Sequence, residues 1–115
     1  MSGVPPSMLR IEQAEQVDRA DNGGAVVLYL HGEIDLASAD VLSTAIDRAI
    51  KAGWHRVVLD FSGVEFVNAT GLGVLVGATK KLRAGGGDLV VRSFQGIPSA
   101  ALALTGLDQY LTFES

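Results

Sequence analysis

The sequence predicts a single α/β domain, with a mixed sheet of four to five strands and about three to four helices mainly on one face. Two β-rich segments come first, and segments of strand and helix periodicity then alternate toward the C-terminus. Each longer expected helix has one apolar stripe, as in helices that cover one face of a sheet. The 115 residues are the size of one domain, and 48% apolar residues suffice for a core.

The first half of the chain predicts a strand pair followed by a helix. Residues 1–7 are expected to form a flexible tail, and residues 8–14 alternate weakly, as a first strand would. A turn signal at residues 21–24 precedes a nearly all-apolar segment at 25–30, which is typical of a buried strand. A helix ending at Gly53 follows, since six apolar residues recur at helical spacing: Val41, Leu42, Ala45, Ile46, Ala49 and Ile50.

Strand and helix alternate in the second half. Residues 56–61 predict a short strand and residues 70–83 a second helix, whose last turn holds the cations that a helix dipole favours there. The glycines at 85–87 are expected to end this helix and to turn the chain into a strand at 88–92. Residues 97–105 predict a short third helix, and residues 110–113 a last edge strand.

Composition excludes several functional classes. The net charge of −4, with no basic run, disfavours a nucleic-acid-binding role. The chain has no cysteine, so disulfides and thiol chemistry are excluded and a reducing compartment is expected. We expect no signal peptide and no membrane span, because no apolar segment approaches about 20 residues. These features predict a cytoplasmic protein.

The titratable residues predict no catalytic or metal site. His31 and His55 flank expected strands without Cys or His at metal-ligand spacing, so solvated strand-end histidines are the commoner interpretation. Glu33 and Asp35 lie two residues apart and could form an acid/base pair. A turn or helix-cap role is nevertheless the more common reason for an aspartate there. We therefore expect no enzyme, no metal and no cofactor.

The strand-to-helix junction at residues 66–76 permits two interpretations. In the structural one, Asn68 or Thr70 caps the helix, while Gly71 and Gly73 allow close packing against the sheet. In the functional one, free backbone N–H groups at a helix start attract an anion. Gly71, Gly73 and Gly77 miss the dinucleotide fingerprint by one residue, so a small nucleotide- or anion-binding domain is a weaker alternative.

Four segments together resemble the STAS domain family, closest to the bacterial anti-sigma factor antagonists. They are Gly-Glu-Ile-Asp at 32–35, Val-Val-Leu-Asp at 57–60, Val-Glu-Phe-Val at 64–67, and the run at 71–76. The resemblance covers residues 8–113 and implies one STAS domain over residues 8–115. It implies a protein that binds an anti-sigma factor, a small serine kinase, and so frees a sigma factor. The kinase of such a pair phosphorylates a serine at the start of the second helix, and this breaks the complex.

The family's usual run at that helix start is Asp-Ser-Ser/Thr-Gly-Leu-Gly. This chain departs at Asn68, which replaces the aspartate, and at Ala69, which replaces the phosphoacceptor serine. Because alanine has no hydroxyl, the usual switch cannot operate at Ala69. The residues that match the pattern are Thr70, Gly71, Leu72 and Gly73, and Thr70 is the possible alternative acceptor.

The resemblance implies a partner-binding surface made of Gly32, Glu33 and Asp35 with the six residues from Asn68 to Gly73. Three explanations of Ala69 are open: an antagonist that is always competent to bind, phosphorylation of Thr70, or another partner. The last would make the chain a STAS subunit of a lipid-transport or signalling assembly. We expect a monomer or a weak dimer.

Overall fold

The computed structural model describes residues 8–16, 24–93 and 111–114. These form seven elements: β1 (Arg10–Gln16), β2 (Ala25–Ile34), α1 (Ala39–Lys51), β3 (Arg56–Val67), α2 (Ala69–Ala84), β4 (Asp88–Arg92) and β5 (Thr112–Glu114). The described part of the chain thus contains two helices, against three to four predicted. The expected tail, most of the turn at 21–24 and the third helix at 97–105 lie outside the described residues.

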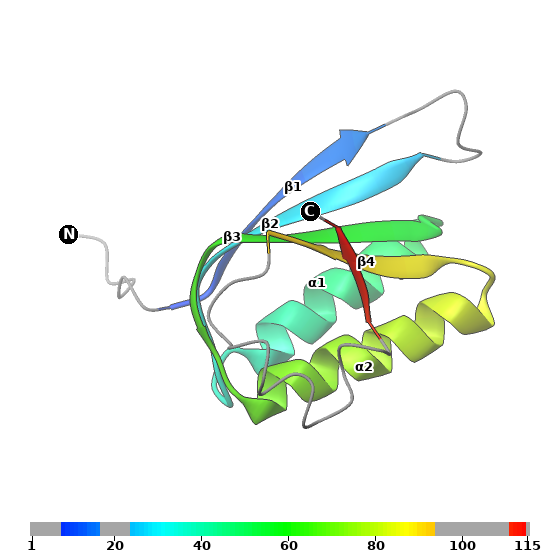
Figure 1. The fold of residues 1–115 in the computed structure, drawn as a ribbon. Coiled ribbons are helices and arrows are strands. Elements are labelled where there is room, and N and C mark those ends of the chain that lie inside the picture. The colour runs from blue at the N-terminus through cyan, green and yellow to red at the C-terminus, as the bar shows by residue number, and fades with distance from the viewer. Residues whose placement is uncertain (1–7, 17–23, 94–110, 115) are drawn as a thin grey trace.

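The five strands form one mixed sheet in the order β1-β2-β3-β4-β5. β1 pairs antiparallel with β2, and the other three pairings are parallel. Parallel strands need right-handed crossovers, and the crossovers through α1 and α2 both advance in the same direction along the sheet. Both helices therefore lie on one face, as predicted, where Figure 1 shows them side by side beneath the strands.

The main core lies between the helices and the sheet. Alternate residues of the central strands point to it, such as Leu28 and Leu30 of β2 and Leu59 and Phe61 of β3, all at most 1% exposed. Val41, predicted to share the apolar face of α1, is instead 48% exposed. The predicted stripe was too wide, because α1 meets the sheet mainly through its buried residues Ala39, Leu42, Ile46 and Ala49.

β3 runs to Val67, well past the predicted end at residue 61, because its pairing with β2 continues through two irregularities. One lies between the Tyr29–Asp60 and His31–Gly63 pairs, where β3 has one residue more than β2. The second, after residue 64 of β3, again adds one residue to that strand. Such bulges bend a strand, and Figure 1 shows β2 and β3 curving together toward the start of α2.

Gly71 lets α2 pack closely against the sheet. A Cβ at this position would lie 2.6 Å from Ile34 Cγ2 and 3.0 Å from Val67 Cγ1. A Cβ at Gly73 would meet nothing within 4 Å. The expected packing role is therefore confirmed at Gly71 and wrong at Gly73, since Gly73 is exposed on the outer side of the helix.

The sheet face away from the helices carries a smaller buried cluster and an ion pair. The cluster is Ala25, Val27, Val58 and Val90. Arg92 Nε of β4 donates to Asp60 Oδ2 of β3 at 3.0 Å. Partial burial raises the pKa of Asp60, but the hydrogen bonds from Ser62 and Arg92 outweigh it and hold that pKa below its ordinary value.

Replacing Asp60 by Asn tests this ion pair through the pH dependence of stability. The carboxyl pKa is lower in the folded chain than its ordinary value of 3.8, so its contribution is complete above that pH and is lost as the pH falls through the folded value. We expect Asp60→Asn to lower the free energy of unfolding in urea by about 1–3 kcal/mol at pH 7. The difference in free energy of unfolding between the wild type and the variant should become smaller below about pH 4.

The exposed Asp47–Lys81 pair that joins the two helices supplies the control. Asp47→Asn should change the free energy of unfolding by less than about 1 kcal/mol, because exposed pairs contribute little. An Asp60→Asn effect that is constant from pH 7 to pH 3 would contradict the role assigned to the carboxylate.

Replacing Gly71 by Ala tests the close approach of α2. The added methyl group would press on Ile34 and Val67, so we expect the free energy of unfolding to fall by about 1–3 kcal/mol. Gly77→Ala, on the same helix, is the matched control, since a Cβ there would meet no neighbouring element within 4 Å. It should stabilise the protein by about 0.5–1 kcal/mol through helix propensity. Equal effects of the two substitutions in urea denaturation would refute the packing argument.

Candidate functional site

The two segments expected to bind a partner meet at one edge of the sheet. Residues 32–38 comprise the end of β2 and the loop after it, and residues 68–73 follow β3. Because β2 and β3 are parallel neighbours, their carboxyl ends lie together, and Ile34 pairs with Val67. The Asn68 N–H then donates to the Ile34 carbonyl oxygen at 3.0 Å, which joins the two segments directly.

Ser38 holds the loop between β2 and α1 in shape. Its buried hydroxyl donates to the Glu33 carbonyl oxygen and accepts from the Asp35 N–H, both at 2.9 Å. In return, Asp35 Oδ1 accepts from the Ser38 N–H at 3.1 Å. The Asp35 carboxylate therefore serves the turn that starts α1, which is the commoner of the two interpretations of the Glu33–Asp35 pair.

Asn68 is the residue that caps α2. Its side-chain Oδ1 accepts from the Gly71 N–H at 3.1 Å, and its carbonyl oxygen accepts from the Leu72 N–H at 3.1 Å. Thr70 is not the cap and lies exposed in the first turn. Leu72 is only 9% exposed and packs into the core, so it positions the helix rather than presenting a side chain outward.

Exposed apolar side chains gather around this loop, and none of them was among the predicted site residues. Leu36 is 76% exposed at its tip, and Phe66, at the end of β3, is 47% exposed. Met8 and Val41 line a cavity of about 250 Å³ together with residue 33 at the end of β2 and loop residues 35, 37 and 38. Clustered exposed apolar groups are typical of protein–protein contact sites. The signal for Leu36 was a large apolar residue inside a turn.

The histidines take no part in this site. His31 lies within β2 rather than at a strand end, because β2 continues to Ile34; its Nε2 is 3.7 Å from Glu12 Oε1. His55 is exposed just before β3, as predicted. Within the described ranges, no three His, Cys, Asp or Glu residues are arranged to hold a metal ion. Neither α1 nor α2 has the length and apolar character needed to cross a membrane.

Relatives with assigned names match this chain over part of its length. The anti-sigma-F factor antagonist RsfB of Mycobacterium tuberculosis (strain ATCC 25618 / H37Rv) is 38% identical over 63 residues, 55% of this chain and 52% of that protein. An anti-sigma F factor antagonist of Paenibacillus polymyxa is 29% identical over 77 residues, 66% of each chain. The match thus spans about half the length of the first relative.

Solved structures and a family model cover more of the chain. An anti-sigma factor antagonist from Mycobacterium paratuberculosis superposes with a TM-score of 0.76 at 27% identity, over 95% of this chain and 87% of that one. The antagonist SpoIIAA in its unphosphorylated form has the same fold, with a TM-score of 0.63 at 21% identity over 89% and 88%. The STAS domain model matches residues 15–115. The chain therefore belongs to the STAS domain family.

Proposed function

We propose that this protein is an anti-sigma factor antagonist, which binds an anti-sigma factor of the serine kinase type and thereby releases a sigma factor. The observation that carries the proposal is the surface formed where residues 32–38 meet residues 68–73, edged by exposed apolar side chains. The names of the relatives support the same function. Such a protein acts by binding, without catalysis of its own.

The rigidity of this surface suits it to binding. Hydrogen bonds through Ser38 and Asp35 fix the loop before any partner arrives, so little conformational entropy remains to be lost on association. Leu36 stands on this fixed loop with most of its side chain in water. Burying such a side chain against a partner contributes about 1.5–3 kcal/mol. Leu36 is therefore the anchor that we assign to the complex.

Regulation of the proposed complex should differ from the family's usual switch. Ala69 is the first residue of α2. The resemblance to the family's usual run aligns Ala69 with the phosphoacceptor serine. Without a hydroxyl there, a partner kinase cannot expel the antagonist by phosphorylating this residue. We propose that the antagonist is always competent to bind and that control acts elsewhere. Thr70 is the alternative acceptor, since its side chain is exposed in the same turn.

Replacing Leu36 by Asp tests the binding surface. We expect the affinity for the anti-sigma factor, measured by calorimetry with the purified proteins, to fall at least about tenfold. Leu36→Met should keep the affinity within about threefold, because it preserves the apolar contact. Ala84→Asp, at the exposed far end of α2, controls for the added charge. If the wild-type chain binds none of the anti-sigma factors of its source organism, the proposed function is wrong.

Restoring a hydroxyl at position 69 tests the missing switch. We expect the wild-type chain, incubated with the kinase and ATP, to take up no phosphate and to stay in the complex. Ala69→Ser should be phosphorylated at position 69 and released, because a phosphate adds about −1.5 to −2 charges at the contact. Mass spectrometry locates the phosphate, and Thr70→Ala is the control. Phosphate on Thr70 of the wild type would contradict the always-competent form of the proposal.

A further inference from the structure

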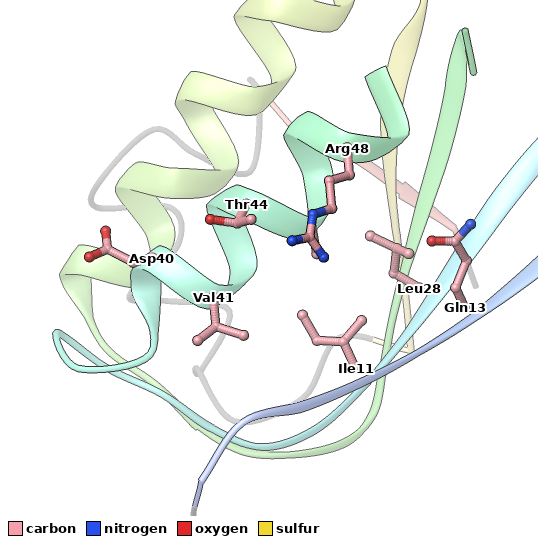
Figure 2. Close-up of a pocket in the computed structure, with 8 residues that line it drawn as sticks. Ile11, Gln13, Leu28, Asp40, Val41, Thr44 and Arg48 are labelled. Carbon is pink, nitrogen blue, oxygen red and sulfur yellow. The ribbon is translucent and has the colours of Figure 1, made fainter. Parts of the chain in front are cut away.

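A second surface lies beside the loop between β2 and α1, where the edge strand β1 extends past α1. It is a groove of about 520 Å³. Figure 2 shows Ile11 of β1 and Val41 of α1 projecting into the space between strand and helix. The residues that line it are Ile11 and Gln13 of β1, Leu28 of β2, and Asp40, Val41, Thr44, Ala45 and Arg48 of α1.

The groove exists because the helical layer is narrower than the sheet. Five strands at about 4.8 Å spacing place the outer strands roughly 19 Å apart. Two packed helices lie only about 8–10 Å apart. α1 packs on β2 and on α2, and leaves Ile11 partly buried and Gln13 exposed on the same side of β1. The surface beneath β1 is therefore not fully covered by α1.

This groove is continuous with the proposed partner surface. Val41 lines both the groove and the smaller cavity, which also includes Met8, Glu33 and Asp35. Val41 is 48% exposed between them. A partner seated on the loop would therefore reach the open end of the groove without crossing any other element of the described chain.

The charges along α1 give the groove two different ends. Asp40, Thr44 and Arg48 recur every four residues and form one row about 12 Å long. Val41 and Ala45 form a parallel apolar row beside it. The end near the loop is acidic, because it holds Asp40 and adjoins the cavity lined by Glu33 and Asp35, whereas the far end holds Arg48. A complementary segment would be apolar, with a cation at the loop end and an anion opposite Arg48.

We propose that an amphipathic helix of the anti-sigma factor docks in this groove, which rests on the proposed function and extends its contact surface. A helix would take the next place in the helical layer and bury Ile11, Val41 and Ala45. A strand added to the edge of β1 suits the site less, because β1 carries the exposed charged residues Arg10 and Glu12, and charged side chains on an edge strand disfavour pairing with a further strand.

Charge reversal at the far end of the groove tests the proposal. Arg48→Glu should weaken binding of the purified anti-sigma factor at least about tenfold, because the anion of the docked helix would then face a carboxylate. Lys80→Glu makes the same charge change at an exposed position on α2 that does not line the groove. Its affinity for the anti-sigma factor should stay within about threefold of the wild-type value. Both positions are exposed, and urea denaturation verifies that both variants fold.

Photo-cross-linking identifies the occupant independently. Thr44 is exposed in the middle of the groove, and replacing it with p-benzoylphenylalanine should capture one peptide of the anti-sigma factor. A captured peptide with apolar residues at helical spacing supports the proposal. A peptide of alternating strand pattern, a second copy of this chain, or no captured peptide overturns it.

The two proposals fail in different ways. If the wild type binds no anti-sigma factor, the proposed function fails and the groove proposal fails with it. The other case is that the wild type binds an anti-sigma factor and Leu36→Asp weakens that binding, but Arg48→Glu binds as tightly as the wild type. In that case only the groove proposal is overturned.

Discussion

The parallel pairing of β2 with β3 is the constraint on which the rest of this structure depends. It places the ends of both strands at one edge of the sheet, where the last pair is Ile34 with Val67. One further hydrogen bond, from the Asn68 N–H to the Ile34 carbonyl oxygen, fixes where α2 begins. Since the loop into α1 begins directly after Ile34, both helices start from the same strand pair. Their N-termini, and the surface between them, follow from that pairing.

Polar and apolar residues have different roles at this surface. The polar side chains of Asp35, Ser38 and Asn68 bond to the backbone of their own turns, so they fix its shape. Large apolar side chains at the same surface are left in water, and Leu36 is the most exposed of them. A motif rich in Asp, Ser and Asn therefore does not imply a polar contact. In the proposed complex, the motif residues would fix the shape of the surface, and the exposed apolar residues beside them would supply the affinity.

Much of the fold could be predicted from local sequence, because periodicity and glycine positions are local signals. The bounds of β4 were predicted to the residue and those of α2 to within one. The extension of β3 through residues 62–67 could not be predicted, since it depends on pairing with β2 across two bulges. Periodicity placed Val41 on an apolar face, but only the packing of α1 against the sheet determines how much of that face is covered. The meeting of the two site segments required the parallel topology.

The geometry of α2 bears on how a phosphate could act here. The helix starts at Ala69 and has no acidic residue in its first turn, so its positive N-terminus could accommodate a phosphate. Thr70 is one residue further, and successive residues of a helix are rotated by about 100°. A phosphate on Thr70 would therefore point in a different direction from one at position 69 and would face a different part of a docked partner. The two positions would therefore not be interchangeable as acceptors, and an exposed hydroxyl at Thr70 would not by itself replace the proposed switch at position 69.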